Sequence, residues 1–212
     1  FTEENFRSGD LNFQFLPTDR YIADLESQSA FAAYTLQKEK FNLNVGMRFQ
    51  RDAIDVLFDV NNFPGRRGAT NKEYTNLYPS VNFKYNLTED QGVRFAGSRT
   101  ITLPEFKEIA PFEYVSPVGQ VTKGNPDLEA SINYNFDLKY EWFPSSDELL
   151  SVAAFYKMIN DPINKVQQRG SAGIFSYFNA GDQANIFGLE LEGRVNIVKP
   201  VEDSGNIGVR LS

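Results

Sequence analysis

The chain has 212 residues, 14% of them aromatic, a net charge of −7, and neither Cys nor His. Without Cys there can be no disulfide or thiolate metal site, and without His the commonest general base and transition-metal ligand are missing. An acidic chain without basic clusters is also unsuited to neutralising the phosphates of a nucleic acid. No stretch approaches the roughly 18 apolar residues of a membrane-spanning helix. The mean hydropathy of −0.41 nevertheless agrees with membrane strands, which are apolar only at alternate positions.

Apolar and polar residues alternate along most of the chain, which is typical of strands whose two faces meet different surroundings. Residues 1–28 are expected to lie mainly in a loop, with Phe13 and Phe15 at the beginning of a strand. About eight strands are then predicted from the alternation. They cover residues 29–36, 41–55, 77–85, 93–101, 132–142, 149–158, 187–195 and 207 onward. Most of them meet the 9–11 residues that a strand needs to cross a bilayer at a tilt.

The connections between the predicted strands alternate strictly between short and long. The short ones are residues 37–40, 86–92, 143–148 and 199–205, and the long ones are residues 56–73, 102–129 and 159–180. A barrel threaded through an outer membrane has this form, with tight periplasmic turns and long outer loops. Pro79 is placed near the outer start of its strand, where a missing N–H is tolerated. The fold class predicted is all-β, an antiparallel up-and-down meander that forms part of a transmembrane barrel.

Several aromatic residues lie near the predicted strand ends, where they are expected to form girdles at the two membrane interfaces. They are Tyr34, Tyr78, Tyr85, Tyr140 and Trp142. The alternative is an aromatic core in a soluble protein. The girdle is favoured because the last three of these residues adjoin short turns on the same predicted side.

Charged and polar residues offer few candidates for a chemical site. Glu190 and Glu192 share a face with Arg194, and paired carboxylates can act as acid and base in a hydrolase. On a strand they are more simply neighbours on a wet inner face. We therefore predict no catalytic residue and no enzymatic activity.

Three other polar motifs are better explained as loops or turns. Asp55, Asp59, Asn61 and Asn62 could offer oxygen ligands to calcium, but their spacing is not that of an EF-hand. Asn86-Leu87-Thr88 matches a glycosylation sequon, but its Asn and Thr are residues that favour a turn. Gly65-Arg66-Arg67-Gly68 is either a loop tip or a contact for an anion. We therefore predict no metal site and no cofactor, and no ligand-binding residue can be named.

Five segments, in this order, resemble motifs in the barrel of TonB-dependent receptors, particularly those of Bacteroidetes. They are Leu77-Tyr78-Pro79-Ser80-Val81-Asn82 with Asn86-Leu87-Thr88-Glu89, Val93 to Phe106, Gly124-Asn125-Pro126-Asp127-Leu128, Phe155-Tyr156-Lys157, and Asn179-Ala180 with Phe187 to Glu192. The resemblance covers residues 29–197. The chain departs from the motifs at Gly97, Leu103 and Glu129-Ala130, where the family commonly has Tyr, Arg and Lys-Pro, which weakens any claim about a shared loop contact.

The resemblance implies that residues 1–212 are a partial barrel domain in the bacterial outer membrane, without the N-terminal plug domain and the remaining strands. It also implies import of a scarce nutrient such as an iron-siderophore, another metal chelate or a glycan. The implied partners are outer-membrane lipid and lipopolysaccharide, the plug domain of the same parent chain, the TonB complex and the nutrient, but no nucleic acid. Two alternatives stay open from the residues alone. One is a secreted β-sandwich that binds carbohydrate, and the other is an outer-membrane hydrolase carried by Glu190 and Glu192.

Overall fold

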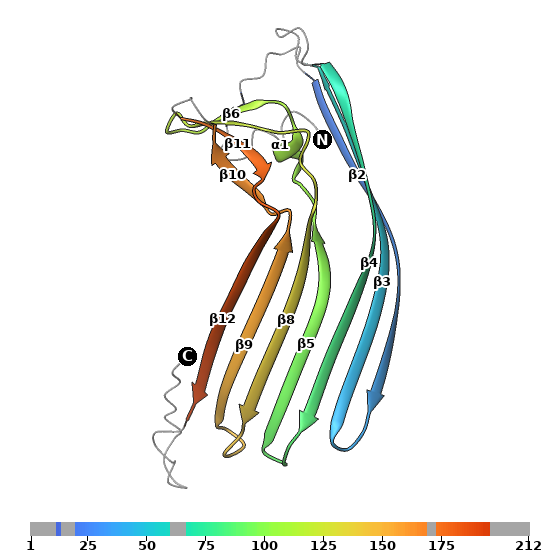
Figure 1. Cartoon of the computed structure of the whole chain (residues 1–212), viewed down its shortest axis with the longest axis vertical. Coiled ribbons are helices and arrows are strands. Elements are labelled where there is room, and N and C mark those ends of the chain that lie inside the picture. Colours follow the sequence, from blue (N-terminus) through green and yellow to red (C-terminus); the bar gives the residue numbers. More distant parts are fainter. Residues whose placement is uncertain (1–11, 14–19, 60–66, 169–172, 196–212) are drawn as a thin grey trace, which may run out of the picture.

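A computed structural model describes residues 12–13, 20–59, 67–168 and 173–195 of the chain. Most of them form one curved antiparallel sheet of seven strands, in the order β12-β9-β8-β5-β4-β3-β2 (Figure 1). These strands are β2 (Arg20–Gln37), β3 (Phe41–Asp59), β4 (Arg67–Asn86), β5 (Gln91–Thr102), β8 (Ser131–Trp142), β9 (Leu149–Asn160) and β12 (Gln183–Arg194). Each strand pairs with those next to it along the meander, so the predicted up-and-down fold is confirmed.

A second set of short elements lies at the end of the sheet opposite the tight turns (Figure 1). They are β1 (Asn12–Phe13), α1 (Phe106–Ile109), β6 (Glu113–Val115), β7 (Val121–Lys123), β10 (Ile163–Gln167) and β11 (Ile174–Asn179). Apart from β1, they belong to the two long connections that follow β5 and β9. We call the sheet the wall, its two ends the turn end and the loop end, and residues 103–130 with 161–168 and 173–180 the cap. Within the described residues, no helix is both long and apolar enough to cross a membrane.

The register of the wall lines up apolar side chains into rows that run across one face. We call this face the outward face and the opposite one the inward face. One such row consists of Leu189, Ala154, Leu138, Phe95, Phe83, Leu43 and Leu36. Phe95, Leu138 and Leu189 of this row are exposed, at 37%, 52% and 77%, and its other members are half-buried. A face this apolar and this open suits lipid rather than water around it. The β-sandwich alternative is therefore wrong, because it needs this face buried against a second sheet.

The strands β3 and β4 are longer than predicted, because their alternation changes phase part of the way along. Phe41 to Phe49 place apolar residues on the outward face, whereas Arg51 and Asp55 place charges on that same face. Beyond Asp52 the inward face carries Ile54 and Val56 instead of polar residues. The segment predicted as a loop at residues 56–73 is therefore strand up to Asp59 and again from Arg67.

β2 begins at Arg20, inside the segment 1–28 that is expected to lie mainly in a loop, because it follows the extension of β3. Residues 1–11 and 14–19 lie outside the described part of the chain, so for them the expectation stays a prediction. Pro79 lies in the interior of β4, opposite Met47, rather than near its start. The eighth strand, expected from Ile207, lies outside the described residues, as does Phe15.

Candidate functional site

The cap folds into a layer of its own before it meets the wall. Its strands and β1 form a sheet in the order β1-β6-β7-β11-β10, in which β7 and β11 run parallel and the other pairs antiparallel. This sheet joins two connections that are distant in the sequence, one after β5 and one after β9. The cap is therefore one structural unit rather than two independent loops.

The cap packs on the inward face of the wall at the loop end. Ile109 and Leu128 of the cap are fully buried in one cluster with Ala23, Ile54 and Val56 of the wall. The apolar residues that β3 turns inward beyond Asp52 thus become a docking surface. Burial of this kind is the dominant favourable term that holds one layer on another.

Tyr21 adds a polar and an aromatic contact to the same docking surface. Its hydroxyl donates a hydrogen bond to the carbonyl oxygen of Phe106 at 2.9 Å, and its ring lies edge-on to Phe112 with the centroids 5.3 Å apart. Burial raises the pKa of Tyr21, so the hydroxyl stays protonated and remains a donor. The contact fixes the start of α1 against the first strand of the wall.

The segment from Gly124 to Glu129 is the hub of the cap. A Cβ atom on Gly124 would lie 1.8 Å from the carbonyl oxygen of Ala110, so only glycine allows the two backbones to pass this closely. The Asn125 side chain donates to the carbonyl oxygen of Tyr177 at 2.9 Å and accepts from the Asp127 N–H at 3.0 Å. These bonds link the hub to β11 and shape its own turn.

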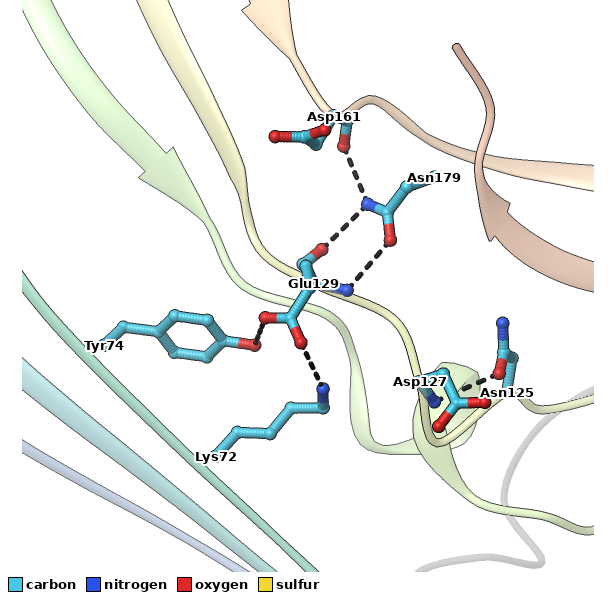
Figure 2. Close-up of polar contacts among 7 residues, drawn as sticks. All are labelled: Lys72, Tyr74, Asn125, Asp127, Glu129, Asp161 and Asn179. Atoms are coloured by element: carbon cyan, nitrogen blue, oxygen red, sulfur yellow. Dashed lines mark hydrogen bonds and ion pairs between the residues drawn. The ribbon is translucent and has the colours of Figure 1, made fainter. Parts of the chain in front are cut away.

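Figure 2 shows how Asn179 and Glu129 join the cap to itself and to the wall. The Asn179 amide accepts from the Glu129 N–H at 2.9 Å and donates to the carbonyl oxygens of Glu129, at 3.0 Å, and of Asp161, at 2.8 Å. The Glu129 carboxylate then receives the ammonium of Lys72 at 3.0 Å and the hydroxyl of Tyr74 at 3.4 Å. Burial, followed by the charge of Glu129, raises the pKa of Tyr74 to about 12.

The wall is split on the side where this contact occurs. The β4–β5 pairing runs from Asn86 and Gly92 only as far as Ser80 and Ser98, and it ends where Pro79 removes an N–H from the strand. Arg99 bridges the beginning of the split, because its guanidinium donates to the Leu77 carbonyl oxygen at 2.5 Å and to Asn76 Oδ1 at 2.9 Å. Above this point β4 continues with β3 alone, while β5 leads into the cap (Figure 1).

The inward face carries a chain of ion pairs nearer the turn end. Arg94 lies 2.6 Å from Glu141, whose side chain is only 9% exposed, and Lys139 lies 3.6 Å from Glu141 and 3.4 Å from Glu192. Glu192 is thus engaged in a structural network, and Glu190 stands opposite Ala153 one register step away. The structure gives these carboxylates no arrangement that favours the hydrolase hypothesis.

Four of the five aromatic residues expected in girdles point outward near the turn end or along the apolar rows. Tyr140 donates to Gln91 at 3.0 Å and the Trp142 indole to Asp90 at 3.1 Å, so their polar tips reach the turn while their rings face outward. Such an arrangement suits a membrane interface. Tyr78 is the exception, because it lies on the inward face with the Arg99 guanidinium 5.8 Å from its ring centroid.

The remaining sequence motifs do not come together as a site. Asp59 pairs with Arg67 at 3.4 Å, whereas Asp55 stands exposed on the outward face. Asn61, Asn62, Gly65 and Arg66 lie outside the described residues. Asn86-Leu87-Thr88 is indeed the turn between β4 and β5, closed by the Leu87 N–H bonded to the Gln91 carbonyl oxygen. Across the described part of the chain, no group of three or more acidic side chains could hold a metal ion.

Sequence reasoning missed Lys72 and Tyr74 and assigned no role to Glu129 or Asn179. The signal for the first two was the reversed alternation of β3 and β4, which places residues 72 and 74 on the face that packs the cap. The contacts of Glu129 join residues 50 and 57 positions apart, and no local pattern indicates such pairs.

A model of the outer membrane protein β-barrel family matches residues 1–212. No curated protein is significantly similar to the chain. Among solved structures, the Serratia marcescens hemophore receptor HasR, solved with its hemophore HasA and heme, is 16% identical, with a TM-score of 0.61 over 80% of this chain and 31% of that one. The siderophore receptor PirA of Pseudomonas aeruginosa is 16% identical, with a TM-score of 0.52 over 84% of this chain and 41% of that one.

The FrpB iron transporter from Neisseria meningitidis is 13% identical, with a TM-score of 0.54 over 92% of this chain and 26% of that one. The chain thus spans less than half the length of each of these three proteins. At such identities the likeness concerns the fold.

Proposed function

Because the chain belongs to the outer membrane protein β-barrel family, we propose that it forms part of the wall and outer mouth of a TonB-dependent receptor that imports a scarce nutrient. The family and the apolar outward rows place the chain in the bacterial outer membrane. On this proposal the turn end faces the periplasm, and the cap faces the cell exterior.

The observation that carries the proposal is the cap. The wall extends past the last of its apolar rows, and the cap packs on the inward face of this extension. A barrel that serves only as an anchor has no need of an inward apolar surface at Ile54 and Val56 or of a folded layer packed on it. Ligand sites of barrels lie at such mouths, where loops are positioned by a rigid scaffold. The polar inward face below the cap is suited to a water-filled interior.

The nutrient class rests on the solved structures of similar fold. Their names describe a receptor for a heme-carrying hemophore, a siderophore receptor and an iron transporter. We therefore propose iron chelates as the first substrate class. Other metal chelates and glycans are the further substrate classes. The chain's part is to bind and admit the nutrient, without chemical conversion.

The partners follow from the same proposal. A plug domain of the parent chain would occupy the interior and meet the network of Arg94, Lys139 and Glu141. The TonB complex would supply energy through the parent chain. Lipid and lipopolysaccharide would cover the outward apolar rows.

The test is uptake by the whole parent receptor in cells that lack other receptors. Residues 106–123 are replaced by a short Gly-Ser linker, and growth is measured with ferric siderophores or heme as the only iron source and with oligosaccharides as the only carbon source. The proposal predicts TonB-dependent growth on one of these nutrients, lost in the linker variant although the barrel still reaches the outer membrane. The proposal would be refuted if growth on each of these nutrients were the same with and without TonB and with and without the receptor.

A further inference from the structure

The cap is attached covalently to one part of the wall and packed on another. Its two connections are continuous with β5, β8, β9 and β12, whereas its buried contacts Ala23, Ile54 and Val56 lie on β2 and β3. Between these two parts the β4–β5 hydrogen bonds stop at Ser80 and Ser98. Above that level the cap and the side chain of Arg99 connect the two parts.

Glu129 is the polar centre of this connection (Figure 2). Its carboxylate reaches across the split to Lys72, whose side chain is only 10% exposed, and to the hydroxyl of Tyr74. Its own N–H and carbonyl groups are both held by Asn179, which in turn bonds Asp161 at the start of the β10–β11 segment. One residue thus joins both cap segments to β4.

The Lys72–Glu129 pair is packed on one side only, because the side chain of Lys72 is 10% exposed and that of Glu129 is 64% exposed. Removal of Glu129 would leave the charge on this packed lysine without its counter-ion, which is unfavourable. The Arg51–Glu73 pair on the same strands gives a contrast. It is bidentate at 2.8 Å, but it is half exposed and stays within the wall. Surface pairs of that kind contribute little to stability.

We propose that Glu129, Lys72 and Tyr74 form a latch that ties the cap to the far side of the split and sets the width of the outer mouth. Pro79 determines where the split begins, and Asn179 positions Glu129 within the latch. When the latch is intact, the extensions of β2, β3 and β4 and the cap move as one body. When it is broken, only the contacts of Tyr21 and the buried cluster of Ala23, Ile54 and Val56 with Ile109 and Leu128 hold the cap to β2 and β3. The distance between the two parts of the wall above Pro79 then becomes longer and more variable, while the sheet below stays paired. The meaning of this width for nutrient entry rests on the proposed function, whereas the latch itself does not.

The experiment measures the distance across the latch in the purified parent receptor, in lipid and without nutrient. The chain has no Cys, so spin labels are attached at Val118→Cys, in the cap turn, and at Leu57→Cys, on the outward face of β3. Both positions are open, at 89% and 54% exposure. Any cysteine elsewhere in the parent chain is replaced by Ser.

We expect a single narrow distance distribution in the labelled parent. Glu129→Ala should broaden it and shift it to longer distances, and Glu73→Ala, the matched control, should leave it unchanged. Lys72→Met, which keeps the apolar stem but removes the charge, should add nothing further to Glu129→Ala, because the two side chains act as a pair. An unchanged distribution in Glu129→Ala, or an equal broadening in Glu73→Ala, would overturn the proposal.

Hydrogen exchange gives a second measurement that does not depend on the labels. Backbone amides of residues 125–131 and 174–179 should exchange roughly ten-fold faster in Glu129→Ala, and those of β8 below the split should not change. Faster exchange throughout β8 would mean that the variant fails to fold, and the latch would then have to be rejected as a local device. Neither measurement uses nutrient or TonB, so loss of the proposed transport function would leave their outcome intact.

Discussion

The closest backbone approach in the cap predicts the effect of one added methyl group. A Cβ atom on Gly124 would lie 1.8 Å from the Ala110 carbonyl oxygen, 2.8 Å from its carbonyl carbon and 2.9 Å from the Lys107 carbonyl oxygen. All three neighbours are backbone atoms, so no side chain can rotate away. Gly124 has no positive φ, and the constraint is space rather than backbone conformation.

Gly124→Ala therefore forces the hub away from α1. Ordinary contact begins at 3.4 Å, so the two segments must separate by about 1.6 Å. Overpacking of a well-packed site costs about 1–3 kcal/mol, and a clash with backbone alone belongs at the upper end, near 3 kcal/mol. The loss falls on the cap, because the hub's bonds to Tyr177 and Glu108 depend on the same approach.

Hydrogen exchange of the receptor in lipid measures this effect. We expect faster exchange over residues 103–130, with no change in β3 and β4 below Pro79, and normal heat-modifiable migration of the barrel. Gly193→Ala is the matched control, because its new Cβ would find only Leu150 at 3.7 Å, an ordinary contact. Exchange in Gly124→Ala that equals the control would refute the close-approach argument.

Three more predictions follow from burial, orientation and ionisation. Leu128→Ala, at a fully buried cap position, should cost about 3 kcal/mol and loosen the cap in the same exchange measurement, and protection equal to that of the unmodified receptor would contradict the packing. Leu189→Arg should lower the free energy of unfolding of the barrel by about 2–4 kcal/mol, measured by urea unfolding from vesicles, because this side chain faces lipid. Glu190→Arg, on the inward face, should not lower it. Equal effects of the two substitutions would mean that the faces are assigned wrongly. Since the pKa of Tyr74 is raised to about 12, its contribution to stability is complete below pH 10 and is lost as the pH rises towards 12. Cap protection should fall over that interval, and Tyr74→Phe should make the fall smaller without abolishing it, because burial also raises the pKa of Tyr21 at the same docking surface. A fall of unchanged size in Tyr74→Phe would contradict the role of this hydroxyl.

The membrane-spanning part of the wall could be predicted from the sequence because lipid imposes a local rule. Every second residue of a strand meets the bilayer, and the alternation around Phe136, Leu138 and Leu189 follows from that alone. The tight turns could also be predicted, because turn residues such as those at 86–90 form hydrogen bonds with their own backbone. Both inferences use only neighbours in the sequence.

The extensions and the cap could not be predicted in this way. Beyond Gln50 the outward face of β3 meets water and the inward face meets the cap, so the alternation continues with its phase reversed and resembles a polar loop. The latch joins Lys72 to Glu129 and Glu129 to Asn179, contacts that exist only after the chain has folded.

The change of phase along β3 also determines where the cap lies relative to the bilayer. The outward apolar positions run from Phe41 to Phe49, a length of roughly 27 Å along the strand, which a tilt of about 40° reduces to some 20 Å of height. An outer-membrane barrel needs an apolar band about 25 Å tall, so little of the lipid-facing surface extends beyond Phe49. Arg51, paired with Glu73, is the first charge on this face, and Ile54, the first residue of the docking surface, lies further out still. The cap therefore contacts the wall only where the wall has left the lipid, and opening the latch would expose apolar residues to water instead of to the membrane.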